Sequence, residues 1–283
     1  MIQGYQLLDA GDFRKLEQVG PYRIVRPAAG AVWSPRLPRA EWERIDAEFF
    51  RHSGGDGRWE YHNASVKTGL TATIELPGWK MQLKSTEFGH LGLFAEQFAN
   101  WQELSRLATP RDGTELRVLN LFAYTGGSTL ACASAGAHVV HLDASKTTVT
   151  WARENAERSG MSEHPIRWIV DDVKKFVARE CRRETKYHGI ILDPPSYGRG
   201  PKGQIWKIED DLPELLTQLF SLLDPDFRFF LLSAHSQGYT PIALENMLRP
   251  NLPSGKYMAR EMCIPGDTLL PSGASCLFER DNT

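Results

Sequence analysis

The chain has 283 residues, of which 41% are hydrophobic and 24% charged, so it is long enough for one large or two modest globular domains. Its net charge of −2, from 33 basic and 35 acidic residues, excludes a general electrostatic attraction to nucleic acid and leaves only a local basic patch open. No apolar run approaches the ~20 residues of a membrane helix, no secretory signal is visible, and the four cysteines lack zinc-ligand spacing. We therefore expect a cytoplasmic protein with reduced thiols, no metal and no membrane association.

The first part of the chain, up to about residue 110, has the pattern of a small β-rich domain. Turn-forming Gly and Pro residues separate short strand-like runs. The expected strands cover residues 22–25, 58–62, 71–76 and 79–84. Apolar residues at helical spacing predict one helix over residues 39–51 and a linking helix over residues 92–107. A turn-rich stretch at residues 109–113 then marks a boundary, so we expect an N-terminal β-rich domain with its linking helix over residues 1–110.

Beyond residue 110 strand-like and helix-like runs alternate. The strands are continuous apolar runs, which is typical of a parallel sheet covered by helices on both faces. The expected strands cover residues 116–122, 137–142, 166–170, 189–192 and 228–233, with a closing pair over 257–264 and 274–279. The expected helices cover residues 128–135, 145–159, 173–182, 210–223 and 241–248. We therefore predict a doubly wound, Rossmann-like α/β domain with a seven-stranded sheet over residues 111–283, which binds its ligand beyond the carboxyl ends of the strands.

The first loop at that edge, residues 120–128, leads from a strand into a helix through Gly126 and Gly127. Paired glycines allow a ligand to approach the backbone closely, and a helix N-terminus offers free N–H groups to a negative group. The carboxylate of a methionine tail, as in S-adenosylmethionine, suits this environment. A tight turn whose glycines serve packing alone explains the pattern equally well.

Acidic residues follow the next two strands. Asp143 closes the second strand and could accept both ribose hydroxyls of an adenosine group. After the third strand Asp171 or, preferably, Asp172 could accept a hydrogen bond from an adenine amino group. These acids, and Ser145, could instead cap the helices that follow. Acids after successive strands, in register with a glycine loop, are harder to explain by capping alone, so the pattern favours a nucleoside-containing cofactor.

The fourth loop ends a buried strand with Asp193, Pro194 and Pro195, followed by Tyr197. Prolines fix the backbone, so a carbonyl can be held toward a substrate, and a tyrosine offers a stacking face to a planar group. A nicotinamide-dependent oxidoreductase has no need of this element, and a purely structural turn is the weaker interpretation. We interpret these four residues as the catalytic set.

A glycine-rich stretch, residues 198–207, comes directly after the fourth loop. It carries Arg199, Lys202, Lys207 and Trp206. One interpretation is a mobile loop whose three basic residues meet the phosphates of an RNA substrate. A solvated loop whose Trp206 packs back on the domain is an equally good interpretation.

Taken together, residues 88–97, 120–127, 143–145, 171–173 and 193–197 resemble a known family. It is the bacterial class I S-adenosylmethionine-dependent methyltransferase family that includes the large-subunit ribosomal RNA cytosine-C5 and guanine-N7 methyltransferases. The resemblance implies that residues 122–127 hold the methionine end of the cofactor, Asp143 its ribose and Asp172 its adenine, and that residues 92–97 cover it. The expected cofactor-binding residues are Phe94, Gln97, Asn120, Phe122, Ala123, Tyr124, Thr125, Gly126, Gly127, Asp143, Ala144, Ser145, Asp171 and Asp172.

Two features separate this chain from members of that family that modify cytosine C5 in RNA. Family members that act on RNA usually carry an additional small RNA-binding domain, which has no clear counterpart in the first 85 residues. The C5 members have a cysteine after the fifth strand, where this chain has His235, and Ser196 rather than cysteine follows the two prolines. We therefore expect transfer to a nitrogen, with His235 either a proton acceptor or, preferably, a strand-end histidine.

The sequence thus predicts an S-adenosylmethionine-dependent methyltransferase that methylates a nitrogen of a nucleic-acid base or of a similar planar group. Ribosomal RNA is the favoured substrate. A methyltransferase of proteins or small molecules is the alternative within the same chemistry. The alternative of another class is a non-catalytic protein that binds S-adenosylmethionine or a nucleotide.

Overall fold

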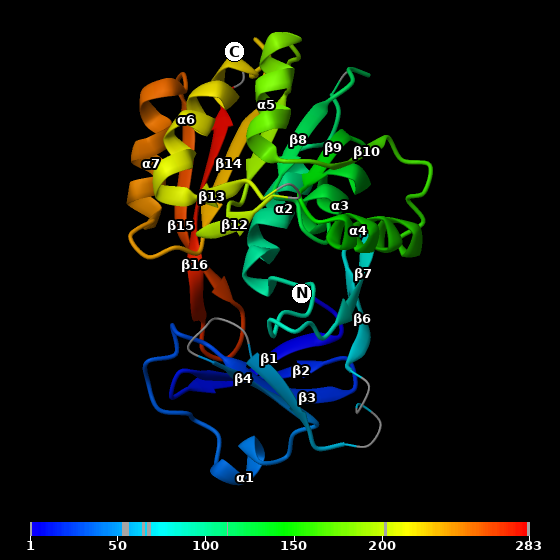
Figure 1. Ribbon diagram of the computed structural model, residues 1–283, viewed down its shortest axis with the longest axis vertical. Helices are drawn as coiled ribbons and strands as arrows, with labels where there is room; N and C mark the ends of the chain where they lie inside the picture. The colour runs from blue at the N-terminus through cyan, green and yellow to red at the C-terminus, as the bar shows by residue number, and fades with distance from the viewer. Residues whose placement is uncertain are drawn as a thin grey trace. The chain divides into compact units, whose positions relative to one another are not determined.

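The structure of the protein is a computed structural model, which describes residues 2–52, 57–63, 66, 69–111, 113–200 and 203–281. The chain forms two compact units (Figure 1). Unit 1 comprises Met1–Phe98 and Met262–Ser272, and unit 2 comprises Ala99–Glu261 and Gly273–Thr283. In this division, residues 99–107 of the expected linking helix belong to unit 2, and a segment near the end of the given sequence belongs to unit 1. No helix in the described part of the chain is long and apolar enough to cross a membrane.

Unit 1 is built on a five-stranded sheet and a separate hairpin. The sheet has the order β1-β2-β3-β4-β5, and only β3 and β4 pair in parallel. The strands are β1 (Tyr5–Gly11), β2 (Arg14–Val19), β3 (Tyr22–Pro27), β4 (Ala47–Arg51) and β5 (Gly57–Tyr61), and the hairpin is β6 (Thr71–Leu76) with β7 (Trp79–Lys84). The unit is therefore β-rich, and it includes two strands, β1 and β2, that the sequence pattern did not reveal.

The helix predicted over residues 39–51 is wrong. Only a single turn forms, α1 (Arg39–Trp42), where the Trp42 ring nitrogen donates to the Asp9 carboxylate at 3.0 Å. The Asp46 carboxylate then accepts from the backbone N–H of Arg23 at 2.8 Å, which aligns the chain with β3. Residues 47–51 continue as strand β4, because Ala47 and Phe49 alternate into the interior. Tertiary pairing thus overrides an apolar spacing that fits a helix and a strand equally well.

Unit 2 has the predicted doubly wound α/β fold. Its seven-stranded sheet has the order β10-β9-β8-β11-β14-β16-β15, with β16 antiparallel to β14 and the first five strands parallel. The strands are β8 (Arg117–Leu121), β9 (His138–Asp143), β10 (Ile166–Val170), β11 (Gly189–Leu192), β14 (Phe229–Ala234), β15 (Gly255–Ile264) and β16 (Leu270–Arg280). The order reverses between β8 and β11, which is the switch point where ligands of such sheets bind.

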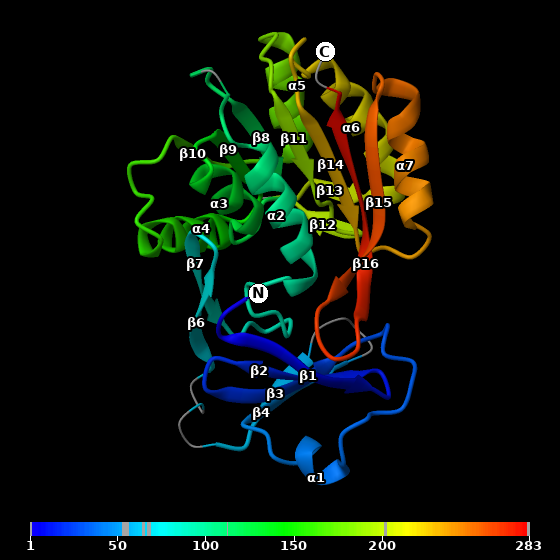
Figure 2. The same cartoon turned by 180° about the vertical axis from the view of Figure 1, so that it is seen from behind.

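Helices cover both faces of this sheet. Figures 1 and 2, taken from opposite sides, show α2 to α4 on one face and α5 to α7 on the other. The helices are α2 (Phe98–Leu107), α3 (Gly127–Ser134), α4 (Lys146–Arg158), α5 (Val173–Arg182), α6 (Ile208–Ser221) and α7 (Pro241–Leu248), with short turns η2 (Ala95–Gln97) and η3 (Arg249–Asn251). A large core of fully buried aliphatic and aromatic side chains lies between the sheet and α5 to α7. This two-sided burial is what made the apolar strands readable from the sequence.

Candidate active site

Strand register brings the predicted loops of unit 2 to one edge of the sheet. Leu121 pairs with Leu142 of β9 and with Leu192 of β11, and Leu192 pairs with Leu232 of β14. The loops that follow these four strands therefore begin at the same level. Asp143 directly follows Leu142, and Asp193 directly follows Leu192. These two acids, predicted from separate motifs, therefore lie at the ends of the strands to either side of β8.

The loop after β8 has a strained backbone. Phe122 and Tyr124 adopt φ angles of 55° and 49°, which residues with a side chain rarely do, and Gly126 has a φ of 94°. Two contacts hold this shape: the Ala123 N–H donates to the Leu142 carbonyl at 3.0 Å, and the Asn155 side chain donates to the Thr125 carbonyl at 3.0 Å. Such strain persists only where surrounding structure enforces it, and it is most common in binding loops.

The two glycines of the loop are required for different reasons. Gly126 provides the left-handed turn before α3, at a φ of 94°. Gly127 allows a close approach, because a Cβ there would lie 2.5 Å from the ring of Trp101 on α2. The packing interpretation of this pair therefore has direct support. The end of α3 still has no side-chain cap, so its N–H groups can face a ligand.

Asp143 accepts three hydrogen bonds, one from the loop after β8 and two from the start of α4. Its Oδ2 accepts from the Tyr124 N–H at 2.9 Å, and its Oδ1 accepts from the Ser145 N–H at 2.9 Å and from the Thr148 hydroxyl at 3.0 Å. Ser145 is itself the N-cap of α4. Since a carboxylate offers about four acceptor positions, Asp143 can accept one further hydrogen bond. From the sequence we expected it to accept two, from both ribose hydroxyls.

The two acids after β10 differ in how many of their carboxylate oxygens already accept hydrogen bonds. Asp171 accepts from the Asp172 N–H and pairs with Arg179. Asp172 is the buried N-cap of α5, and its Oδ1 accepts from the Lys175 N–H at 3.0 Å. Its Oδ2 faces Gly200, where an added Cβ would lie 3.1 Å away, and accepts no hydrogen bond from the described residues. Asp172 therefore acts as a helix cap, and one of its acceptor oxygens stays available, so the adenine contact remains a prediction compatible with the cap.

A buried polar network supports the loop from below. The Asn120 side chain donates to the Thr129 hydroxyl at 2.9 Å, and this oxygen lies 2.9 Å from Nδ1 of His141. All three residues are almost fully buried. Burial lowers the pKa of His141 from 6.5 to about 3, so the ring is neutral. The sequence analysis assigned Asn120 to the cofactor and missed Thr129 and His141. A polar residue inside the apolar strand β9 is the signal that could have identified His141, whereas Thr129 on the small-residue helix α3 gave no comparable signal.

The end of β11 carries the predicted catalytic carboxylate. Oδ1 of Asp193 accepts from the Ser233 hydroxyl at 2.7 Å and lies 3.8 Å from Nε2 of His235. Tyr197 is half exposed, and its hydroxyl accepts from Nε of Arg199 at 3.2 Å. Asp193, His235 and Tyr197 therefore belong to one end of the sheet, with a planar aromatic face open to solvent.

The glycine-rich stretch that follows forms a hairpin, β12 (Tyr197–Arg199) with β13 (Ile205–Lys207). Trp206 is buried within it: its ring nitrogen donates to the Pro195 carbonyl at 2.7 Å, and its ring centroid lies 4.9 Å from that of Phe122. The interpretation in which this residue packs back on the domain is confirmed. Arg199 and Lys207 are exposed, whereas Lys202 lies outside the described residues. Since Trp206 occupies the Pro195 carbonyl, the Pro194 carbonyl is the one that could face a substrate.

None of the four cysteines lies at the ends of β11 or β14. All four are free thiols. Cys132 on α3 and Cys276 on β16 are buried. Burial raises the pKa of the Cys276 thiol to about 12 and that of Cys132 still further. Neither can supply a thiolate near neutral pH.

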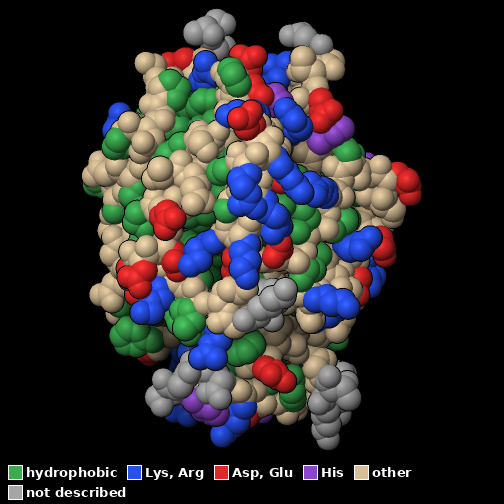
Figure 3. Space-filling model, turned by 45° about the horizontal axis from the view of Figure 1, so that its top comes forward, with side chains coloured by type: hydrophobic (Ala, Val, Ile, Leu, Met, Phe, Trp, Pro, Cys, Tyr) green, Lys and Arg blue, Asp and Glu red, His purple; other side chains and the backbone are tan. Residues whose placement is uncertain are grey.

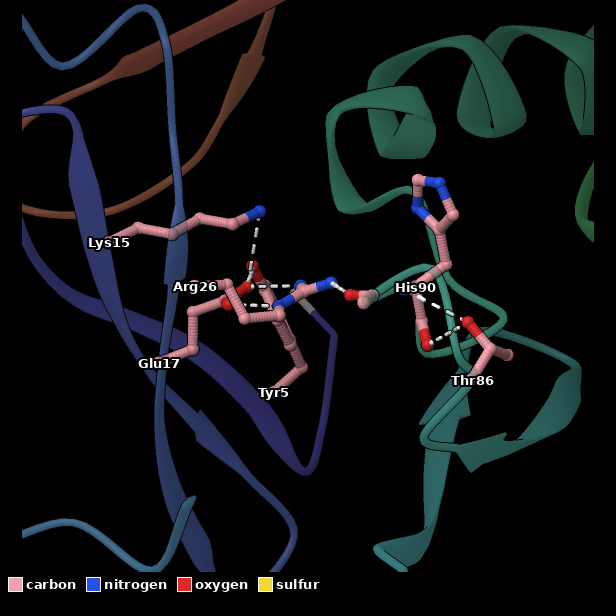
Figure 4. Close-up of polar contacts among 7 residues, drawn as sticks. Tyr5, Lys15, Glu17, Arg26, Thr86 and His90 are labelled. Carbon is pink, nitrogen blue, oxygen red and sulfur yellow. Dashed lines mark hydrogen bonds and ion pairs between the residues drawn. The ribbon is translucent and has the colours of Figure 1, made fainter. Parts of the chain in front are cut away.

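The remaining predicted residues, Phe94 and Gln97, belong to unit 1. Gln97 is buried, and Phe94 packs its ring 5.4 Å from that of His90. The turn before them is fixed by two hydrogen bonds between Thr86 Oγ1 and the His90 backbone, at 3.0 and 3.1 Å. Figure 4 shows this turn beside a buried ionic cluster of Tyr5, Lys15, Glu17 and Arg26.

That cluster links the N-terminal sheet to the segment of residues 88–97. Arg26 donates to both carboxylate oxygens of Glu17, at 2.7 and 2.8 Å, and through Nη1 to the Gly89 carbonyl at 2.9 Å. The Tyr5 hydroxyl donates to Glu17 at 2.7 Å. Unit 1 therefore holds one end of the 88–97 segment through a fully paired, buried arginine.

Comparison with known proteins agrees with this geometry. The sequence matches the sequence model of the S-adenosylmethionine-dependent methyltransferases over residues 78–250, more than half of the chain. The chain belongs to this methyltransferase family. A solved structure of the SAM-dependent methyltransferase from Agrobacterium tumefaciens is 35% identical to it, with a TM-score of 0.92 over 99% of this chain and 92% of that chain. The predicted family, fold and cofactor are confirmed.

Two curated relatives of the methyltransferase are named for ribosomal RNA. Ribosomal RNA large subunit methyltransferase K/L of Methylococcus capsulatus is 29% identical over 80% of this chain. Ribosomal RNA large subunit methyltransferase I of Aeromonas salmonicida is 32% identical over 54% of this chain. The chain spans about a third of the length of these relatives, 30% and 37% respectively.

The chemical groups at the sheet edge of this methyltransferase fit S-adenosylmethionine. The uncapped N-terminus of α3 suits a carboxylate, Asp143 retains room for one hydroxyl donor, and Oδ2 of Asp172 can accept from an amino group. These groups follow three neighbouring strands, β8, β9 and β10. A methionine tail joined to an adenosine offers a carboxylate, ribose hydroxyls and an adenine amino group in that order.

Proposed function

We propose that this methyltransferase methylates a nitrogen of an RNA base and that ribosomal RNA is its substrate. The observation that carries the proposal is the Asp193 carboxylate, held at the end of β11 by Ser233, with the exposed ring of Tyr197 four residues further along. A carboxylate and a rigid proline carbonyl can accept hydrogen bonds from an amine, and a half-exposed tyrosine can stack on a base. RNA methylation would also place the protein in the cytoplasm.

The proposed roles of the cofactor-binding residues follow from the open groups described above. Residues 122–127 would receive the methionine end, Asp143 one ribose hydroxyl and Asp172 the adenine amino group. When bound, S-adenosylmethionine supplies a methyl group on a positively charged sulfur, which leaves as a neutral thioether. The residues of the chain therefore need mainly to orient and desolvate the base.

Nitrogen is favoured over cytosine C5 because of the cysteines. Attack at C5 needs a thiolate that adds to the ring, and Cys132 and Cys276 are buried in helix and strand interiors with raised pKa values. At the position that follows β14 the chain has His235, 3.8 Å from Asp193. A histidine there can accept the proton that an exocyclic amine releases.

Methyl transfer from isotope-labelled S-adenosylmethionine tests the proposal directly. Purified protein is incubated with separate pools of ribosomal RNA, tRNA, protein and metabolites, and labelled RNA is digested to nucleosides. We expect label in ribosomal RNA, in an N-methylated nucleoside. Replacing Asp193 with Ala should lower the rate roughly 100-fold or more while S-adenosylhomocysteine still stabilises the variant by about 2.7 kcal/mol at one hundred times its dissociation constant.

The matched control is Asp226→Asn, which removes an exposed carboxylate on the turn before β14. It should leave the rate unchanged. Label only in protein or metabolites would show another substrate class, and label in 5-methylcytidine would contradict nitrogen transfer. A protein that binds S-adenosylhomocysteine but labels no pool would support the non-catalytic alternative and overturn the proposal.

A further inference from the structure

The outer face of α5 carries a row of positive charges that the active site does not use. Helical spacing places Lys175, Arg179 and Arg182 on one side, at positions i, i+4 and i+7. Val173, Phe176, Val177 and Glu180 occupy the opposite, buried side. We call Lys174, Lys175, Arg179, Arg182 and Arg183 together the α5 basic face.

The charge of this region stands out from that of the whole chain. Residues 174–186 contain six basic and two acidic residues, although the chain as a whole has a net charge of −2. One of the two acids, Glu180, is only 2% exposed and accepts from the buried Tyr187 hydroxyl at 2.8 Å and from Arg183 at 3.0 Å. It therefore presents almost no negative charge to solvent. Figure 3 shows Lys and Arg side chains gathered on the side of the molecule that bears α5.

Part of this charge is not neutralised within the protein. Lys174 pairs with Asp211 at 2.6 Å, and Arg179 pairs with Asp171. Lys175 and Arg182 are exposed and form no ion pair with any described residue. Exposed cations without local partners are the ones that can exchange their counterions for the phosphates of a nucleic acid.

The N-terminal end of the α5 basic face lies next to the β12–β13 hairpin, which begins at Tyr197. Asp211 joins the two, because its carboxylate holds the Lys174 ammonium and also accepts from the Lys207 N–H of β13 at 2.8 Å. Gly200, at the end of β12, lies against Asp172 at the start of α5. The exposed Arg199 and Lys207 of this hairpin therefore extend the face toward Tyr197.

We propose that the α5 basic face binds the phosphate backbone of the RNA whose base enters the active site, an inference that rests on the proposed function. A lipid surface is the other common partner of a basic helix, but such a helix inserts apolar side chains on its free side. The apolar side chains of α5 are committed to the core, and none of the large exposed hydrophobic residues of the described chain lies on this helix. The α5 basic face presents only Lys and Arg side chains, which suit contacts with phosphates.

The double variant Lys175→Gln/Arg182→Gln tests this surface. Its binding to deproteinised bacterial large-subunit ribosomal RNA is compared with that of the wild type by filter retention between 0.05 and about 0.3 M salt, a range over which phosphate contacts give a measurable slope. We expect roughly tenfold weaker binding at about 0.1 M salt and a salt slope reduced by about 1.5 to 2, one contact for each residue. Stabilisation by S-adenosylhomocysteine should not change, since the substitution keeps the backbone N–H through which Lys175 donates to Asp172.

The matched control is Arg153→Gln/Lys256→Gln, which removes two exposed cations from α4 and β15. It should bind RNA as the wild type does. Equal losses in both variants, no loss in either, or a wild type that binds vesicles of phosphatidylglycerol but no RNA would each overturn the surface. RNA binding that depends on Lys175 and Arg182, in a protein that transfers no methyl group to RNA, would confirm the surface and refute the proposed function instead.

Discussion

At the scale of single residues, the loop after β8 rests on a set of buried polar side chains. Asn120, Thr129 and His141 form a buried polar network at the ends of β8 and β9, next to the strained residues Phe122 and Tyr124. A buried network of this kind is costly to leave half satisfied, so each member depends on the protonation and position of the others. The most sensitive member is His141, because its ring must stay neutral.

Acidification should therefore destabilise unit 2 through His141. The unfolded chain binds a proton near pH 6.5, whereas the folded ring does so only near pH 3, so the stability is fully present above pH 6.5 and is lost progressively as the pH falls toward 3. The free energy at stake is on the order of 4 kcal/mol. Urea unfolding at a series of pH values should show this loss. His141→Gln should be less stable at neutral pH but should have a flatter pH profile between these limits; an unchanged profile would show that another group is responsible.

At the scale of elements, the packing of α2 against α3 fixes the entry to the cofactor loop. Gly127 begins α3 directly beneath the indole of Trp101, whose ring nitrogen donates to the Ser128 hydroxyl at 3.2 Å. The two helices are thus in contact at the point where the loop ends. Any side chain at residue 127 must push the indole away.

Replacing Gly127 with Ala should cost about 1 to 3 kcal/mol, because the added methyl group overpacks the contact with Trp101. This loss would occur even though Ala is the better helix former. Thermal unfolding of the single variants and of Gly127→Ala/Trp101→Leu provides the check. The smaller Leu should accommodate the methyl group, so the double variant should lose at least about 0.5 kcal/mol less than the sum of the two single variants. Simple additivity would mean that the contact does not limit this position.

Helices and strands were predictable where the spacing of apolar residues fits only one type of secondary structure. Helix α5 and strand β11 were predicted with their observed bounds, because a helix with one clearly apolar side and a fully buried strand allow no other arrangement. The helix predicted over residues 39–51 failed, because its aromatic spacing fits a strand as well and pairing with β3 and β5 decided the outcome. The β12–β13 hairpin was missed because its order depends on a hydrogen bond from Trp206 to the Pro195 carbonyl. No residue pattern in the sequence indicates that contact.

The same holds for the candidate site: residues at strand ends could be predicted, whereas residues that meet from different elements could not. Asp143, Asp172 and Asp193 could be identified because each follows a strand of a parallel sheet, which brings such residues to one edge. The supporting residues could not, because Thr129 and His141 reach Asn120 from different elements. Likewise, the expectation against cytosine C5 chemistry came from the sequence, which has His235 where a cysteine was expected, while the burial of Cys276 became visible only in the fold.

At the scale of the whole molecule, the two units have different ionic interiors. Unit 1 is held by the Glu17–Arg26 pair, in which neither residue is more than 8% exposed. Burial alone would raise the pKa of Glu17, but the adjacent Arg26 and Lys15 outweigh it and lower the pKa to about 2. The unit should therefore resist mild acid better than unit 2 does.

The acid unfolding of unit 1 should follow Glu17. A carboxylate with a pKa of about 2 in the fold and 4.5 in the unfolded chain contributes stability that is present above pH 4.5 and lost as the pH falls toward 2, on the order of 3 kcal/mol. Hydrogen exchange read by mass spectrometry on separate peptides should show unit 2 opening at higher pH than unit 1. Glu17→Gln should remove the response of unit 1 in this window, and it should be less stable by about 3 kcal/mol because Arg26 is left without its partner. Simultaneous opening of both units in the wild type would contradict the assignment.

Unit 1 is assembled from two separate parts of the chain, and this has a consequence for its synthesis. Residues 262–272 complete it, and Gly266 packs against Leu7 while the Ser272 hydroxyl donates to Glu96 at 3.0 Å. A ribosome makes this segment only after more than nine-tenths of the chain, so the first 98 residues must wait for it through the synthesis of nearly all of unit 2. The N-terminal part of unit 1 therefore reaches its finished form only after most of unit 2 has been synthesised.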